Sequence, residues 1–142
     1  MTHDHDAPRV EPVGYIRSTL QSTKGAPRQS TAGAPDAWLE ILPEFAPGLA
    51  GLSAGDEVYV FTWLHLGDRR VLQVHPRGDA SNPLRGVFST RSPARPNPIG
   101  LHPVTIREIA GTRLRIGPIE AVDGTPVLDV KPVLHGRARP EP

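Results

Sequence analysis

The chain has 142 residues and a formal net charge of +1, and it contains 17 prolines, 14 glycines and no cysteine. Proline removes a helix hydrogen-bond donor and glycine weakens a helix interior, so this composition excludes long helices, helical bundles and coiled coils. The lack of cysteine excludes disulfides, thiolate metal ligands and a cysteine nucleophile.

Both ends of the chain are polar, contain proline and show no periodicity. They predict mobile tails over residues 1–10 and 136–142, around a single domain at residues 11–135. The N-terminus has neither the basic flank nor the apolar core of a signal peptide. No apolar run approaches the roughly 20 residues that span a bilayer. We therefore expect a soluble, cytoplasmic protein with no membrane partner.

Between the tails, eight segments have the alternation and the β-branched or aromatic side chains of short strands. They are residues 13–18, 38–42, 57–66, 70–75, 86–90, 104–109, 113–116 and 127–130. Segment 57–66 is the longest, and Gly67 and Asp68 predict a hairpin turn from it to segment 70–75. Short strands, with no convincing helix and no Gly-x-Gly-x-x-Gly motif, predict an all-β fold, a compact single-domain β-barrel with no Rossmann fold.

Residues 90–100 resemble neither a strand nor an ordinary turn. Three prolines in six positions fix the backbone and push the residues before them into extended conformations. The result is a stiff loop that carries Arg91, Arg95 and Asn97 with little freedom to lose on binding. A proline-rich surface connector is an equal alternative.

Two further segments carry groups that suit small polar ligands. Residues 27–29, Pro-Arg-Gln, offer donors for a carboxylate or a nucleobase, the alternative being a solvated loop. Residues 123–126, Asp-Gly-Thr-Pro, predict a tight turn whose backbone amides and carboxylate are exposed. Asp129 and Lys131 share one face of the last strand, which indicates a structural ion pair.

The common catalytic motifs are absent. The sequence has no P-loop, no Gly-x-Ser-x-Gly elbow and no His-Glu-x-x-His. His3 and His5 alternate with aspartates, but a terminal tail is a poor pre-organised ligand set. We therefore expect no metal site.

Charge is unevenly distributed along the chain. Residues 1–68 have a net charge of −5, whereas residues 69–115 hold nine arginines and two acids. The basic segment is the electrostatic footprint expected for a phosphate-bearing ligand. An arginine-rich, GC-rich coding sequence explains the same excess.

Residues 86–101, GVFSTRSPARPNPIGL, resemble the signature block of the TsaA-like family. Residues 14–18, 27–29, 51–52, His65 and 123–132 also match, so the resemblance extends from about residue 11 to residue 134. It implies a β-barrel that binds S-adenosylmethionine as its cofactor, usually as a homodimer with cofactor sites near the subunit interface. Family members of known activity methylate N6 of threonylcarbamoyladenosine in tRNA, beside the anticodon.

The resemblance also implies which residues serve the site. It assigns cofactor binding to Pro27, Arg28, Gln29, His65, Leu66, Arg91, Leu101, Asp123, Gly124, Thr125 and Pro126. It assigns substrate binding to Arg95, Pro96, Asn97 and Pro98 of the stiff loop, and to Lys131. Chemistry alone makes His65 and Asp129 the candidates for a general base.

Two differences from the family's sequence pattern concern the methyl acceptor. Longer members of the family have an additional C-terminal domain that helps to hold tRNA, whereas this sequence stops at Pro142. Val133 stands where the family often has tyrosine. Three hypotheses therefore remain: a methyltransferase acting on tRNA, a methyltransferase acting on a small molecule or another nucleic acid, and a non-catalytic S-adenosylmethionine-binding module.

Overall fold

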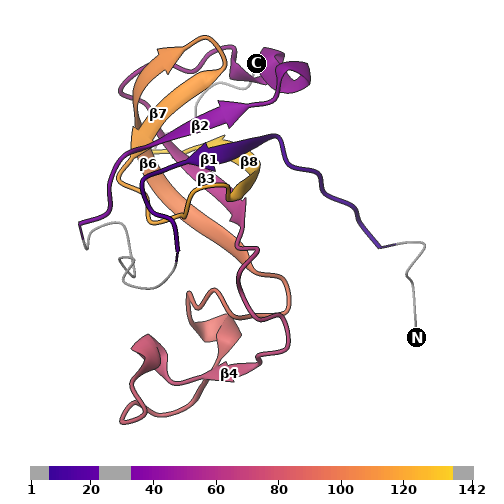
Figure 1. The fold of residues 1–142 in the computed structure, drawn as a ribbon, viewed down its shortest axis with the longest axis vertical. Helices are drawn as coiled ribbons and strands as arrows, with labels where there is room; N and C mark the ends of the chain where they lie inside the picture. Colours follow the sequence, from indigo (N-terminus) through magenta and orange to yellow (C-terminus); the bar gives the residue numbers. More distant parts are fainter. Residues whose placement is uncertain (1–6, 23–32, 136–142) are drawn as a thin grey trace.

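The computed structural model describes residues 7–22 and 33–135, and its main body is a closed barrel of six strands (Figure 1). The strands follow the order β1-β2-β7-β6-β3-β8, and every neighbouring pair is antiparallel. Their bounds are β1 Gly14–Arg17, β2 Ala37–Ile41, β3 Glu57–Trp63, β6 Ile99–Ala110, β7 Arg113–Gly117 and β8 Pro126–Pro132. This architecture confirms the all-β barrel that the sequence predicts.

Strict alternation along the strands fills the barrel. On β3, Val58, Val60 and Thr62 are buried, while the residues between them face outward. The same period on the other strands produces one apolar core of isoleucine, leucine and valine. Its fully buried members are Ile16, Leu39, Val58, Val60, Ile106, Leu114, Ile116, Ile119 and Val127.

The helices of the described residues are all of the short 3-10 type. They are η3 Pro43–Leu49, η4 Pro76–Gly78 and η5 Val87–Ser89, and each begins at or next to a proline or a glycine. None of the described helices is long and apolar enough to cross a membrane.

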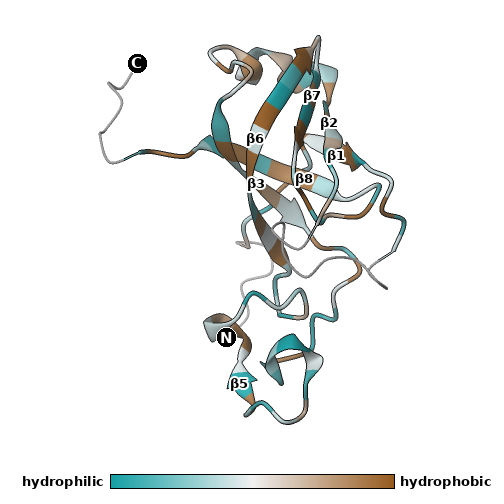
Figure 2. Cartoon of the chain, turned by 90° about the vertical axis from the view of Figure 1, so that its left-hand side faces the viewer, coloured by the Kyte–Doolittle hydropathy of each residue, from teal (hydrophilic) through white to brown (hydrophobic). Residues whose placement is uncertain are grey.

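A long excursion leaves one end of the barrel between β3 and β6, and we refer to residues 64–98 as the arm (Figure 1). The arm contains η4, η5 and a separate two-stranded sheet of β4 Gln73–Val74 and β5 Arg85–Gly86. Figure 2 shows it as a loosely folded extension with hydrophobic segments, apart from the barrel.

The arm overturns three predictions about local structure. The strand predicted at 57–66 ends at Trp63, because the chain turns there and the Leu64 N–H donates to the Pro98 carbonyl oxygen at 2.7 Å. The hairpin predicted between that strand and residues 70–75 is wrong, since β6 and β8 occupy both edges of β3. The strand predicted at 86–90 is a 3-10 helix from residue 87.

Strand β6 is longer than predicted: it begins at Ile99 and includes Pro103. The sequence predicts a strand only from residue 104, as proline cannot donate to a ladder hydrogen bond. In the structure Pro103 lies opposite Tyr59 of β3, while the pairing with β7 begins only at Thr105. One edge of β6 is therefore unpaired at the proline, and the strand extends back to Ile99.

Candidate functional site

A cleft of about 1360 Å³ lies between the arm and the end of the barrel from which the arm leaves. The arm supplies residues 64–68, 74–78, 85 and 89–94, and the barrel supplies His102 and residues 120–122 and 125. The arm thus meets residues of the barrel that follow it in the sequence, up to Thr125, at one site. The barrel end is a rigid wall, and the arm forms the opposite wall.

Four of the predicted cofactor residues lie together in this cleft. His65 and Leu66 follow the end of β3 and are exposed, and Arg91 is exposed on the arm. Thr125 is buried on the barrel side, where its hydroxyl donates to the Val122 carbonyl oxygen at 2.7 Å. The cleft therefore presents a cation, an imidazole and an apolar side chain to whatever occupies it.

Other predicted site residues lie elsewhere. Leu101 faces outward from β6, between the inward-facing Gly100 and His102. Asp129 and Lys131 are exposed on β8, and they form no ion pair with each other. The ion pair predicted between them is therefore wrong; Asp129 instead accepts the N–H of Val130 at 2.9 Å. Residues 27–29 and the two N-terminal histidines fall outside the described residues.

The turn at 123–126 differs from its prediction, because its amides are not exposed to a ligand. The N–H groups of Asp123 and Gly124 donate to the carbonyl oxygens of Leu20 and Ile16, at 2.6 and 2.7 Å. Asp123 Oδ1 accepts the Ser18 N–H at 3.0 Å. These groups fasten the chain that follows β1 to the segment that precedes β8.

Most polar side chains of the stiff loop form hydrogen bonds with other groups of the arm. Arg95 donates to the carbonyl oxygens of Val87 and Thr90, the latter at 2.7 Å. Arg69 donates to the Pro96 carbonyl oxygen at 2.7 Å and to Asn97 Oδ1 at 3.1 Å, while its guanidinium lies 5.1 Å from the centre of the Trp63 ring. Pro98 is buried. Of the loop's five polar side chains, Arg91 alone forms no hydrogen bond with a described residue.

A buried polar chain at the barrel end was missed by sequence reasoning. Thr62 Oγ1 lies 2.7 Å from His102 Nε2, and His102 Nδ1 lies 2.8 Å from Glu120 Oε1. When the glutamate is ionised, the imidazole N–H donates to it and the other ring nitrogen accepts the threonine hydroxyl. Glu120 Oε2 is buried and has no partner within the described residues. His102 and Glu120 line the cleft.

Alternation along β6 would have placed His102 inside the barrel, had the strand been predicted from Ile99. Nothing in the sequence pairs it with Glu120, which comes 18 residues later and lies outside any strand. Two cleft arginines, Arg77 and Arg85, were also missed, because they belong to the part of the arm whose structure was predicted wrongly.

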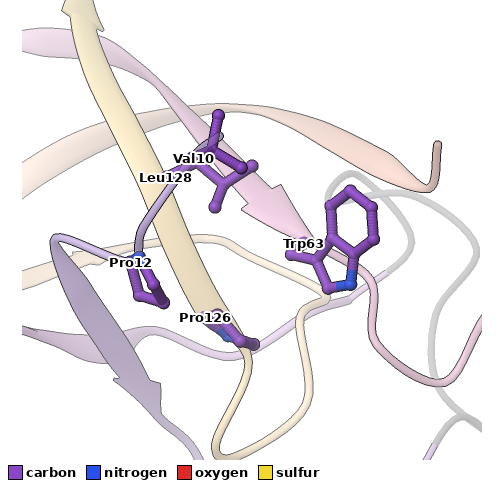
Figure 3. A pocket seen from close by; sticks show the side chains of 5 residues that line it. All are labelled: Val10, Pro12, Trp63, Pro126 and Leu128. Atoms are coloured by element: carbon purple, nitrogen blue, oxygen red, sulfur yellow. The ribbon is translucent and has the colours of Figure 1, made fainter. Parts of the chain in front are cut away.

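A second, smaller pocket of about 260 Å³ lies on the outside of the barrel. Its lining is almost wholly apolar: Val10, Pro12, Trp63, Pro126 and Leu128 (Figure 3). Pro126 therefore faces this pocket and not the large cleft.

These features define a class of protein: a small antiparallel barrel that builds a cleft of mixed polar and apolar lining from one barrel end and a long arm. The family described as the tRNA-methyltransferase O (TrmO) N-terminal domain matches residues 15–136. The chain belongs to this TsaA-like family.

Relatives and solved structures agree with this membership. The chain is 44% identical over 124 residues to a probable S-adenosyl-L-methionine-binding protein of Methanothermobacter thermautotrophicus, covering 87% of this chain and 88% of that protein. It is 38% identical over 122 residues to an S-adenosyl-L-methionine-binding protein of Archaeoglobus fulgidus, covering 86% of each. A crystal structure of TrmO from Pseudomonas aeruginosa superposes with a TM-score of 0.72 at 35% identity, covering 98% of this chain and 61% of that one.

Proposed function

We propose that this protein is an S-adenosylmethionine-dependent methyltransferase that methylates N6 of threonylcarbamoyladenosine in tRNA. The observation that carries the proposal is the cleft, which gathers His65, Leu66, Arg91 and Thr125 from three separate segments. These are residues to which the family resemblance assigns cofactor binding. The names of the relatives support the cofactor, and the family name supports the tRNA acceptor.

The residues of the cleft fit such a cofactor and leave room for an acceptor. Arg91 has no partner among residues 7–22 and 33–135, and its guanidinium suits the carboxylate of the cofactor's amino-acid portion. Leu66 supplies apolar surface for the adenine, and His65 adds a polar group beside it. Small-molecule sites usually occupy about 300–1,000 Å³, so a cleft of about 1360 Å³ holds a cofactor together with a nucleoside.

When bound, the cofactor supplies a methyl group on a sulfonium, which is already an activated leaving group. The chain's own residues then have to align the acceptor nitrogen with it, and positioning of this kind supplies several kcal/mol of catalysis. The acceptor N–H is that of a urea and must lose its proton. His65 is exposed in the cleft and is the proton acceptor that we propose. Asp129 is not part of the cleft lining, so it does not reach an acceptor bound there.

We also propose that the protein is a homodimer formed through the arm. Leu66, Leu72, Leu84 and Phe88 of the arm are each more than half exposed, and Phe88 is 86% exposed. An exposed apolar group of this kind marks an interaction site in a folded protein. A cofactor site near the subunit interface also explains why Leu101, a predicted cofactor residue, faces away from the cleft of its own chain. Sedimentation equilibrium tests the stoichiometry.

A non-catalytic S-adenosylmethionine-binding module, or a methyltransferase with another acceptor, is the second candidate. The curated relatives are named only for S-adenosyl-L-methionine binding. The chain also spans about 55–63% of the TrmO chains it matches. Cofactor binding without methylation of any tRNA favours this candidate.

Calorimetric titration with S-adenosylmethionine tests the cofactor site. We expect micromolar binding by the parent protein, loss of that binding in Arg91→Ala, and parental affinity in Arg107→Ala, which removes an arginine that is paired with Asp36 on the barrel. Absence of binding in folded protein that is free of carried-over ligand would reject both candidates.

A further inference from the structure

The arginines of the cleft differ from the other arginines of the domain in having no partner. Six of the nine arginines in residues 33–135 hold a carboxylate or a carbonyl oxygen: Arg69, Arg70, Arg95, Arg107, Arg113 and Arg115. The side chains of the other three, Arg77, Arg85 and Arg91, form no hydrogen bond or ion pair with any residue that the structure describes. All three line the cleft, and none of the six partnered arginines does.

Arg77 is held toward the cleft by an unusual backbone. Its φ of 61° and ψ of 19° lie in the left-handed region, which residues other than glycine rarely occupy unless their surroundings impose it. The surrounding turn is closed by its own hydrogen bonds: His75 Nδ1 donates to the Asn82 carbonyl oxygen at 2.7 Å, and Asn82 Nδ2 donates to that of Pro76 at 2.8 Å. The turn thus holds the exposed Arg77 in a backbone conformation that is unfavourable for arginine.

The arm leaves these arginines without neutralising charge. Residues 64–98 contain six arginines and two acids, Asp68 and Asp79. Asp68 pairs with Arg70, and Asp79 accepts hydrogen bonds from Ser81. Neither acid pairs with Arg77 or Arg85 among the described residues, and the arm has an excess of positive charge.

We propose that Arg77 and Arg85 bind backbone phosphates of the RNA that carries the acceptor nucleoside. The inference rests on the proposed function, since it takes the cleft as the acceptor site. Val74 pairs with Arg85 across the β4–β5 sheet, and Arg77 follows β4 within three residues, so both lie on one small unit of the arm. Guanidinium groups suit phosphate oxygens because they donate two parallel hydrogen bonds. Arg91 keeps its proposed role of binding the carboxylate of the cofactor.

The test measures RNA affinity across a series of KCl concentrations, by anisotropy of a labelled, unmodified anticodon stem-loop RNA. This probe has phosphates but no threonylcarbamoyl carboxylate. Each phosphate contact that is lost reduces the slope of log K against log[salt] by about 0.7 for single-stranded RNA. We expect that reduction in Arg77→Gln and again in Arg85→Gln, and an unchanged slope in Arg107→Gln. Glutamine is shorter than arginine, but it keeps a polar end and removes only the charge. The hydrogen bonds that close the turn come from His75 and Asn82 and are retained.

Calorimetry with S-adenosylmethionine separates this inference from the proposed function. We expect parental cofactor affinity in both arm variants, which also shows that they are folded. An unchanged salt slope, an equal decrease in all three variants, or no RNA binding by the parent protein would overturn the inference while leaving the cofactor site intact. Loss of cofactor affinity with an unchanged RNA slope would also overturn it, by assigning these arginines to the cofactor's carboxylate.

Discussion

Among individual residues, Gly100 has crowded surroundings next to His102, which lines the cleft. It faces into the barrel beside the polar chain of Thr62, His102 and Glu120. A Cβ at residue 100 would overlap Thr62 Oγ1 and lie 2.6 Å from His102 Nε2. Both partners are buried and hydrogen-bonded to each other, so neither can move without breaking that bond.

Gly100→Ala therefore destabilises the protein by overpacking, by about 1–3 kcal/mol. Urea denaturation measures the change in the free energy of unfolding. The matched control is Gly48→Ala, because a Cβ there meets nothing within 4 Å. Its effect should stay within about 0.5 kcal/mol. Equal stability of the two variants would contradict this account of Gly100.

Asp68, which lines the cleft, provides a pH-dependent prediction. The backbone N–H of Arg70 donates to Asp68 at 2.9 Å, and with the Arg70 side chain it lowers the pKa of that carboxyl below 3.8. A lowered pKa in the folded state stabilises the turn above pH 3.8, and this contribution is lost as the pH falls through the lower folded-state value. NMR titration of the side chain should give a pKa below 3.8. A pKa at or above 3.8 would show that the turn is not formed in solution.

Among the elements, the strands of the barrel are predicted by the sequence, whereas the structure of the arm is not. Strands β1, β2, β7 and β8 were predicted to within a few residues, because alternation reports directly on a half-buried surface. The arm is too irregular for that signal. It has two strands of two residues each and two 3-10 helices, and its alternating segment 70–75 has no free strand edge of the barrel to pair with.

The arm is ordered instead by single side chains, and Arg69 is the clearest case. It joins the start of the arm to its end by donating to the Pro96 carbonyl oxygen and Asn97 while lying over Trp63. Arg69→Ala should loosen the loop that carries Arg91, and so weaken S-adenosylmethionine binding severalfold in calorimetry. Arg70→Ala is the matched control, since the Arg70 side chain pairs only with the neighbouring Asp68 in the part of the chain that the structure describes. The same affinity in both variants would show that Arg69 does not position the loop.

For the whole molecule, the barrel was predictable and the cleft only in part. Residue types and family resemblance indicated His65, Leu66, Arg91 and Thr125. Their assembly depends on how the arm returns to the barrel, which no local pattern specifies. The same limit explains why the hydrogen bonds by which the Asp123 amide and carboxylate fasten two segments of the chain together were not predicted. It also explains why Glu120 was overlooked.

The central claim is that the cleft transfers a methyl group to modified tRNA. The most direct measurement is mass spectrometry of nucleosides from tRNA incubated with the protein and S-adenosylmethionine. We predict that threonylcarbamoyladenosine is converted to its N6-methyl derivative, that Arg91→Ala abolishes the conversion, and that tRNA lacking the threonylcarbamoyl group is not methylated. No methylated product from a protein that binds S-adenosylmethionine tightly would contradict the claim, and would identify this barrel as a binding module.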